Sequence, residues 1–365
     1  MTVPMVNLRP LLEETRPEWT ANLSRLFERM QFILGEEVAC FEQELARSFG
    51  SRFAVATGTG TAAIELSLRA AGIEGREILL PALTSLFTAQ AVLAARCIPR
   101  FADIHPGTLL LDVADVERRI TPATAAIIPV HLYGQPCPMR ELSRITRRAG
   151  LTLVQDGCQA HGARHEGVAL TRFSPCVAYS FYPTKNLGCL GDGGAVLTDR
   201  SSIAERLRLL RDGGRRNGQV SRLPAINSRL DEMQACYLRA FLPRLAEWNL
   251  ERARIASLYD EALSDCPGIE RVQRSTDSVN HLYVVRARRR DRLRAHLAAR
   301  GISTAVHYPV PLHLQPAFRE FGPARGRLPN AEKACREIVS LPVWPKMPRE
   351  AILRVAESVR EFYKK

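Results

Sequence analysis

One lysine stands apart from the other basic residues of this 365-residue chain. Of its 51 lysines and arginines only five are lysines, and four of these lie at positions 333, 346, 364 and 365. The fifth is Lys185. A lysine amine can lose its proton and attack a carbonyl carbon to form a Schiff base, whereas an arginine guanidinium stays protonated. We therefore infer that position 185 carries chemistry that arginine cannot supply. A surface lysine, or a positive charge that binds phosphate, is the simpler alternative.

A carboxylate suited to the same chemistry lies about thirty residues upstream, at Asp156, directly after an apolar run at 151–154. Pyridoxal phosphate needs such a pair, because a lysine holds its aldehyde while a carboxylate keeps its pyridine nitrogen protonated and lets the ring accept electrons. A neighbouring cation is expected to lower the pKa of Asp156, so that this carboxyl stays ionised. The alternative is that Asp156 only caps a short helix.

Further polar groups flank these two residues. Gln159 could hydrogen-bond the phenolic oxygen of such a cofactor. Ser180 could donate its hydroxyl to the phosphate, although a serine that only packs within a strand is the simpler interpretation. The turn at 58–61 joins a predicted strand to a predicted helix, and its free N–H groups suit a phosphate. Many loops resemble this turn. His161 fits ring packing and a structural hydrogen bond equally well.

Strand and helix patterns alternate over the first two thirds of the chain. This alternation predicts an α/β domain with a largely parallel sheet and helices on both faces. Ligands of such sheets gather beyond the carboxyl ends of the strands, so Asp156, Lys185 and the turn at Gly60 should meet at one edge. The predicted strands are 53–57, 77–80, 98–103, 125–130, 151–155, 176–181 and 195–198; the predicted helices are two within 17–49, separated by Gly35, then 62–71, 84–95, 113–120, 139–149 and 203–211.

The longest helical pattern, at 227–263, is predicted to connect this domain to a smaller α+β one. We expect a large domain at 1–248 and a small C-terminal domain at 249–365. In the small domain we predict strands at 281–287 and 303–307, helices at 291–300, 331–339 and 349–363, and a proline-rich loop at 309–329.

Composition excludes several classes of function. The net charge of +13 is compatible with a polyanionic partner. However, the arginines are mixed with acidic residues along predicted helices, and no nucleic-acid-binding signature is present, so we expect no nucleic-acid partner. No apolar run approaches the roughly 20 residues of a membrane span, and no secretory signal is visible. The nine cysteines form no C-x-x-C pair, which favours a cytoplasmic protein without a metal site.

The chain resembles the DegT/DnrJ family of pyridoxal-phosphate-dependent nucleotide-sugar aminotransferases. The likeness runs in order from about residue 32 to residue 345 and is carried by the segments 60–63 (GTAA), 128–135 (IPVHLYGQ), 156–163 (DGCQAHGA), 180–194 (SFYPTKNLGCLGDGG) and 227–232 (NSRLDE). It implies an aspartate-aminotransferase-like, fold type I homodimer with active sites shared between subunits.

The resemblance also implies a role for each site residue. Lys185 would form the Schiff base with pyridoxal phosphate, Asp156 would pair with the pyridinium nitrogen and Gln159 would bind the phenolic oxygen. The phosphate would be held by Gly60, Thr61 and Ser180, and by Asn227 of the other subunit. The presence of Lys185 argues against a sugar-dehydrating branch of the family that has histidine there.

Within the family, the segment around Lys185 looks closest to enzymes that aminate C3 of a dTDP-linked 3-keto-6-deoxyhexose, because Tyr182 stands where the C4 enzymes typically carry histidine. His307 and His313 match a sugar-contacting loop of the C3 group. The chain departs from the pattern at Ser85, where the family usually has a ring that stacks on the cofactor, so that Phe87 or a thinner group must cover that face. The segment 213–225 also lacks a common tyrosine and has Ala225 for a usual glycine.

These motifs predict an aminotransferase that takes an amino group, expected from glutamate, and passes it to a keto-sugar in two half-reactions. Such a sequence of steps predicts ping-pong kinetics. Three alternatives stay open: another acceptor such as a cyclitol or an aminoglycoside ring ketone, a regulatory protein that binds the cofactor without turnover, and a basic nucleic-acid binder.

Overall fold

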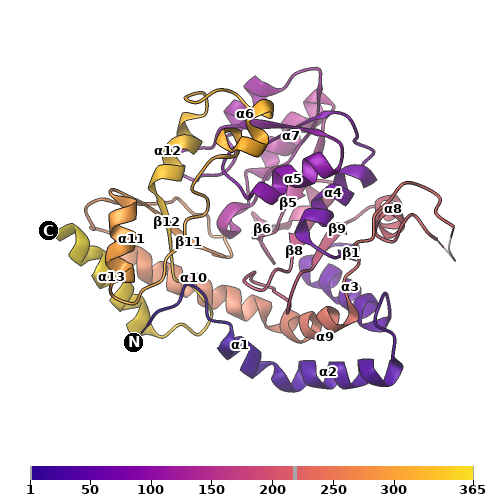
Figure 1. Cartoon of the computed structure of the whole chain (residues 1–365), viewed down its shortest axis with the longest axis horizontal. Helices are drawn as coiled ribbons and strands as arrows, with labels where there is room; N and C mark the ends of the chain where they lie inside the picture. The colour runs from indigo at the N-terminus through magenta and orange to yellow at the C-terminus, as the bar shows by residue number, and fades with distance from the viewer. Residues whose placement is uncertain (1, 217–219, 365) are drawn as a thin grey trace.

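The computed structural model describes residues 2–216 and 220–364 of the chain (Figure 1). The α-helices are α1 (Arg9–Glu14), α2 (Arg16–Arg29), α3 (Glu36–Phe49), α4 (Gly60–Ala70), α5 (Leu86–Ala94), α6 (Val113–Arg119), α7 (Met139–Ala149), α8 (Ser201–Arg211), α9 (Glu232–Phe241), α10 (Leu245–Ala262), α11 (Arg290–Ala298), α12 (Pro329–Glu337) and α13 (Arg349–Lys364). The strands are β1 (Phe53–Thr57), β2 (Glu77–Pro81), β3 (Ile98–Ala102), β4 (Thr124–Ile127), β5 (Thr152–Asp156), β6 (Arg164–His165), β7 (Val168–Ala169), β8 (Cys176–Ser180), β9 (Gly194–Thr198), β10 (Ile269–Arg271), β11 (Tyr283–Ala287) and β12 (Ile338–Leu341).

Seven strands form the main sheet, in the order β1-β9-β8-β5-β4-β2-β3. Strands β3, β2, β4, β5 and β8 run parallel to one another, whereas β9 is antiparallel to both β1 and β8. The prediction of a mostly parallel, mixed sheet is therefore confirmed. Because β5 and β8 are adjacent and parallel, Asp156 at the end of β5 and the segment that follows β8 lie at the same edge of the sheet.

Helix α3 begins at a cap that comes from a distant part of the sequence. Glu232, which is 1% exposed, accepts hydrogen bonds from the backbone N–H groups of Gly35 at 2.7 Å, Glu37 at 2.8 Å and Val38 at 3.2 Å. The first N–H groups of a helix have no internal partner, and their positive end attracts a carboxylate. This acidic residue at the start of α9 therefore fixes the position of α3 beside β1.

Two clusters of buried apolar side chains form the core. The larger cluster surrounds the seven-stranded sheet, and the smaller one joins α10, α11 and α13 to the three-stranded sheet β10-β11-β12. Figure 1 shows α11 and α13 at the opposite end of the molecule from α8. Val3 also packs into the smaller cluster. The division at 248/249 stays a prediction, although two separate clusters agree with two packing units.

Three of the expected elements are wrong. The pattern at 227–263 is not one helix, because residues 227–231 are not helical and a short 3-10 turn, Leu242–Arg244, with Pro243 inside it, separates α9 from α10. The expected strand at 303–307 is reduced to a single bridge between Ala305 and Ser340. Conversely, the end of the helix expected at 331–339 is the strand β12, which pairs with β11.

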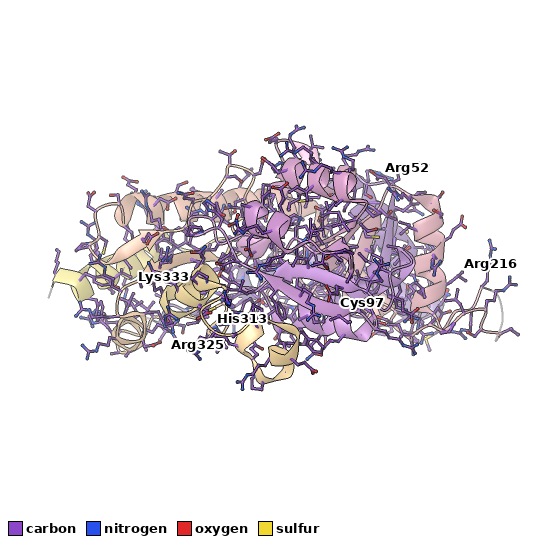
Figure 2. The ribbon with its side chains drawn as sticks, turned by 90° about the horizontal axis from the view of Figure 1, so that it is seen from above. Arg52, Cys97, Arg216, His313, Arg325 and Lys333 are labelled. Atoms are coloured by element: carbon purple, nitrogen blue, oxygen red, sulfur yellow. The ribbon has the colours of Figure 1, made fainter. Side chains whose placement is uncertain are left out.

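The arginines labelled in Figure 2 do not lie on a single face. Arg52, Arg216 and Arg325 project from different sides of the molecule in Figure 2. All nine cysteines lie in the described segments and carry free thiols. Among the helices in the described ranges, none is both long and apolar enough to cross a membrane.

Candidate active site

Lys185 lies in the turn that follows β8. The turn is closed by a hydrogen bond from the backbone N–H of Lys185 to the carbonyl of Tyr182 at 2.8 Å. Burial lowers the pKa of the Lys185 amine below its usual 10.5, while the neighbouring Cys158 and Asp156 act in the opposite direction. A lowered pKa makes the neutral, nucleophilic form of an amine easier to reach at neutral pH.

Asp156 is held in one orientation by two donors. Its Oδ2 accepts a hydrogen bond from Thr88 Oγ1 at 2.8 Å, and its Oδ1 accepts one from the backbone N–H of Cys158 at 3.1 Å. The side chain is 4% exposed. A carboxylate oxygen has capacity for more than one hydrogen bond, so both oxygens remain able to accept from a protonated ring nitrogen.

The Gln159 amide is fixed between two tyrosines. Its Oε1 accepts from the backbone N–H of Tyr133 at 2.7 Å, and its Nε2 donates to the Tyr308 hydroxyl at 3.1 Å. Tyr133 has a left-handed backbone conformation, with φ +61°, which turns its N–H toward Gln159. The Tyr133 hydroxyl in turn donates to the carbonyl of His307. The amide nitrogen of Gln159 is therefore directed toward the segment that carries His307 and Tyr308.

The turn before α4 approaches β8 so closely that only glycine fits at position 60. A Cβ on Gly60 would lie 2.5 Å from Ser180 Cβ and 3.0 Å from Cys158 Sγ. The hydroxyl of Thr59 caps the helix by accepting from the N–H of Ala62 at 3.0 Å, which leaves the first N–H groups of α4, including that of Thr61, without an intrahelical partner. This helix start, with Ser180 beside it, suits an anionic group.

Three other residues were predicted to contact the sugar or the cofactor: Tyr182, His307 and Asn227. Tyr182 is 53% exposed. His307 is half-buried and bonded through Nδ1 to Ser340 Oγ at 2.8 Å, and burial together with the Lys185 charge lowers its pKa to about 4. Asn227 is exposed and pairs with Asp212 in an isolated bridge.

His313 hydrogen-bonds a different set of residues from this group, and its contact with a sugar stays a prediction. The side chain is fully buried; its Nε2 lies 3.3 Å from Glu332 Oε1 (His313 is labelled in Figure 2). Glu332 also accepts from the N–H of Gly326 at 2.6 Å. Glu332 therefore joins His313 to the loop before α12.

Position 85 is filled differently from the expected pattern. Ser85 caps α5 by accepting from the N–H of Phe87 at 3.4 Å, and it is close enough to the Tyr308 phenol to lower the pKa of that group, against the larger effect of burial. Phe87 is 58% exposed, so within this chain it covers no neighbouring group. The polar contact between Ser85 and Tyr308 stands where a stacking ring was expected.

Sequence reasoning missed Thr88, Tyr133 and Tyr308. Each acts on a predicted residue that is far away in the sequence, and Thr88, for example, is 68 positions from Asp156. The one available signal is local and applies to Tyr133, which falls just after the predicted strand 125–130, at the edge where ligands of parallel sheets collect. Thr88 lies inside the predicted helix 84–95, which carries no such signal.

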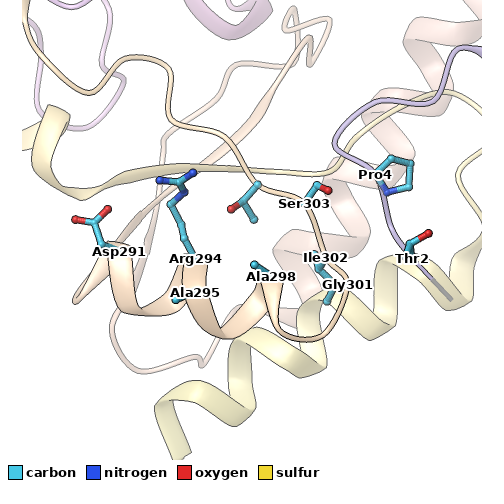
Figure 3. A pocket seen from close by; sticks show the side chains of 10 residues that line it. Thr2, Pro4, Asp291, Arg294, Ala295, Ala298, Gly301, Ile302 and Ser303 are labelled. Carbon is cyan, nitrogen blue, oxygen red and sulfur yellow. The ribbon is translucent and has the colours of Figure 1, made fainter.

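A hollow of about 690 Å³ opens elsewhere, between the N-terminal segment and α11 (Figure 3). It is lined by Asp291, Arg294 and Ser303 among others. None of the residues predicted to act in catalysis lines it, so we do not assign the reaction to this hollow.

Comparison with known proteins agrees with this geometry. The model of the DegT/DnrJ/EryC1/StrS aminotransferase family matches residues 13–360. The chain belongs to this family. A dTDP-3-amino-3,4,6-trideoxy-alpha-D-glucose transaminase from Streptomyces venezuelae is 44% identical over 99% of this chain and 96% of the relative. A protein named pleiotropic regulatory protein from Geobacillus stearothermophilus is 39% identical over 100% of this chain and 99% of the relative.

The crystal structure of S. venezuelae DesV in complex with a ketimine intermediate superposes with a TM-score of 0.97, at 43% identity, covering 100% of this chain and 99% of that one. The likeness confirms the predicted fold type I architecture. The DegT/DnrJ/EryC1/StrS aminotransferases depend on pyridoxal phosphate. The residues present fit this cofactor, because a lysine of lowered pKa, a buried aspartate and a glycine-bounded helix start lie together at one sheet edge.

Proposed function

We propose that this aminotransferase moves the amino group of an amino acid, glutamate by preference, to the C3 keto group of a dTDP-linked 3-keto-6-deoxyhexose. The observation that carries the proposal is the position of the half-buried Lys185 beside Asp156, at the end of two adjacent parallel strands. The choice of sugar is supported by the printed activity of the S. venezuelae transaminase, which is 44% identical over nearly the full length.

When bound, pyridoxal phosphate supplies an electron sink for the charge that develops at the carbon bearing the amine. Lys185 Nζ would hold the cofactor, and in the neutral form that its lowered pKa favours it could take up and return a proton at that carbon. Asp156, oriented by Thr88, would keep the ring nitrogen protonated. Gln159 Nε2 would donate to the phenolic oxygen, and Gly60, Thr61 and Ser180 would hold the phosphate.

The sugar is proposed to enter from the side of Tyr182 and His307. Tyr182 is exposed next to the lysine turn, and the carbonyl of His307 is tied to Tyr133, whose N–H orients Gln159. A neutral imidazole at position 307, which its low pKa maintains near pH 7, can accept a hydrogen bond from a sugar hydroxyl.

We further propose that the protein is a homodimer with shared active sites, located in the cytoplasm. Large apolar side chains are exposed near the lysine turn and at the end of α2, and burying them would stabilise a dimer. They include Phe27, Met30, Phe87, Leu190 and Met233. Asn227 is exposed and free to reach the phosphate in the other subunit. Free thiols at all nine cysteines fit a reducing compartment.

The direct experiment incubates the purified protein, loaded with pyridoxal phosphate, with glutamate and a panel of nucleotide keto-sugars. Mass spectrometry and NMR then identify the product and the aminated carbon. We expect amination of a dTDP-3-keto-6-deoxyhexose at C3, with ping-pong kinetics. A cyclitol or aminoglycoside ketone as the preferred acceptor would contradict the choice of sugar but leave the transaminase assignment intact.

A regulatory role without turnover is the second candidate, favoured by the printed name of the G. stearothermophilus relative. The two candidates differ in the half-reaction with the amino donor alone. If the protein is a transaminase, glutamate converts its visible absorbance stoichiometrically and 2-oxoglutarate appears in solution. A stable absorbance in the presence of glutamate, and of the other common amino acids, would favour the regulatory role.

Shared active sites can be tested by mixing two inactive variants. Lys185→Ala lacks the reactive amine, and Asn227→Ala lacks the proposed contact to the partner's cofactor. If each site uses Lys185 of one subunit and Asn227 of the other, a mixed dimer contains one intact site, and activity returns on mixing. No recovery after subunit exchange, with exchange verified independently, would contradict the shared site.

A further inference from the structure

Five residues form a directional chain of hydrogen bonds behind the lysine turn. His281 Nδ1 bonds Asn186 Oδ1 at 2.9 Å, and Asn186 Nδ2 donates to Asn249 Oδ1 at 2.8 Å. Asn249 Nδ2 donates to the carbonyl of His161 at 2.9 Å, and His161 Nε2 bonds the carbonyl of Ser180 at 2.7 Å. We call this chain the amide relay. Its members come from the turn after β8, from α10, from the loop after Gln159 and from the segment before β11.

The directions of these hydrogen bonds follow from groups that can only accept. Asn186 Nδ2 also lies 3.0 Å from the carbonyl of Val279. Because a carbonyl oxygen cannot donate, the nitrogen of the Asn186 amide faces Val279 and its oxygen faces His281. Nδ1 of His281 must therefore carry a hydrogen. By the same argument, Asn249 presents its oxygen to Asn186, and His161 carries its hydrogen on Nε2.

Both histidines of the amide relay are neutral at physiological pH. Burial, followed by the Lys185 charge, lowers the pKa of His161 to about 3 and that of His281 well below 6.5. Asn186 and His281 are 3% and 6% exposed, and His161 is fully buried. Nδ1 of His161 is buried without a hydrogen-bond partner, but the other ring nitrogen and the two amides bond one another or backbone carbonyls. Loss of one member of such a buried network leaves further groups unpaired.

Two members of the relay, Ser180 and Asn186, stand at the two ends of the lysine turn. Ser180 is the last residue of β8, and Asn186 directly follows Lys185. Between them, the backbone is held by bonds from Phe181 N to the Gly193 carbonyl and from Lys185 N to the Tyr182 carbonyl, each at 2.8 Å. A lysine side chain is flexible, and a displacement of about 1 Å in a reacting group can cost on the order of a hundredfold in rate.

We propose that His281 and Asn249 are positioning residues of the aminotransferase, which fix the Lys185 backbone by clamping both ends of its turn through Asn186, His161 and Ser180. Neither residue needs to touch the cofactor or the sugar to do so. The proposal rests on the proposed role of Lys185 and predicts a specific phenotype. Loss of the clamp slows every step in which the Lys185 amine takes part, while the binding of the sugar is little affected.

The test uses full-length protein freed of cofactor, to which pyridoxal phosphate is added while the visible absorbance of the lysine-linked cofactor is followed. His281→Leu removes the donor to Asn186. His281→Asn keeps one, because the amide nitrogen of asparagine occupies the position of Nδ1. We expect His281→Leu to capture the cofactor at least about tenfold more slowly and to lower kcat by a similar factor with KM for the keto-sugar within about twofold. His281→Asn should recover most of both losses.

His296→Leu is the matched control, because His296 on α11 also bonds a carbonyl, that of Ser358 at 3.1 Å, but lies outside the relay. It should change urea stability without changing capture. Asn249→Ala provides a second disruption at a half-buried position, which is better tolerated if His281→Leu does not fold, and it should also slow capture.

The outcomes separate this inference from the proposed function. Capture by His281→Leu or Asn249→Ala at the wild-type rate, or equal losses in His281→Asn and His281→Leu, would refute the clamp and leave the transaminase assignment standing. If His296→Leu also captures the cofactor more slowly, the effect of His281→Leu is explained by general destabilisation, and the clamp is refuted as well. No capture by the wild-type protein would overturn the role of Lys185 and the clamp together.

Discussion

Replacing Gly60 with alanine tests the approach of α4 to β8 at the proposed phosphate site. The added Cβ would lie 2.5 Å from Ser180 Cβ, 3.0 Å from Ser180 Cα and 3.0 Å from Cys158 Sγ. Carbon atoms pack comfortably at about 3.5–4.0 Å. The start of α4 must therefore move away from β8 by about 1 Å. Because Gly60 and Thr61 carry the N–H groups proposed to bind the phosphate, the same movement weakens that binding.

The expected effect is large on cofactor affinity and small on stability. Overpacking costs about 1–3 kcal/mol, but alanine favours a helix over glycine by about 1 kcal/mol, so the two contributions partly cancel in the free energy of unfolding. Nothing offsets the displaced N–H groups. We expect Gly60→Ala to weaken pyridoxal phosphate binding by at least about tenfold, which corresponds to about 1.4 kcal/mol, with a smaller change in urea unfolding of the apoprotein.

The assay is a titration of apoprotein with pyridoxal phosphate, followed by absorbance, with Ser180→Gly as the matched background. Removing Ser180 Cβ removes the shortest contact, so Gly60→Ala should cost less affinity in Ser180→Gly than in the wild type. Wild-type affinity in Gly60→Ala would refute the reasoning. Equal losses in both backgrounds would show that Ser180 is not the group that the methyl meets.

Three shorter predictions concern neighbouring residues. Thr88→Val removes the donor to Asp156, and because a lost hydrogen bond to a charged group costs about 1.5–3 kcal/mol, kcat should fall about tenfold or more. Thr88→Ser keeps the hydroxyl and should restore kcat. Unchanged steady-state kinetics in Thr88→Val would contradict the orienting role of Thr88. His313→Gln should lower urea stability but leave KM for the sugar within about twofold, and a selective rise in KM would return His313 to the sugar site. Burial lowers the pKa of His131 to about 4 from 6.5. The unfolded chain therefore takes up the proton first, and the free energy of unfolding declines as pH falls from about 6.5 to 4. In urea unfolding, His131→Gln should lose less stability between pH 7 and pH 5 than the wild type. An equal loss in the two proteins would argue against a lowered pKa of His131.

Local patterns predicted the elements whose formation depends on local sequence. The periodicity at 139–149 gives α7 with the same bounds, and the apolar run at 53–57 gives β1. The strand at 303–307 failed because pairing, not alternation, makes a strand, and only Ala305 finds a partner. β12 follows α12 without an intervening turn residue, so the sequence carries no signal where the helix stops.

The candidate site divides in the same way. Lys185 and Asp156 were predicted because their residue types are chemically distinctive and each follows a predicted strand. Asn186, His281 and Thr88 were not predicted, because their roles depend on hydrogen bonds to residues 68 to 95 positions away in the sequence. His313 was expected to contact the sugar by family likeness alone, and that contact stays a prediction; its bond to Glu332, 19 positions away, was not foreseen.

The most direct measurement of the central claim is to identify the lysine that holds the cofactor. The protein is incubated with pyridoxal phosphate, the linkage is fixed with borohydride, and the digested peptides are mapped by mass spectrometry. With five lysines in the chain, the assignment is unambiguous. The account predicts stoichiometric label on the peptide that contains Lys185. Label on one of the four C-terminal lysines instead, or no label at all, would contradict it.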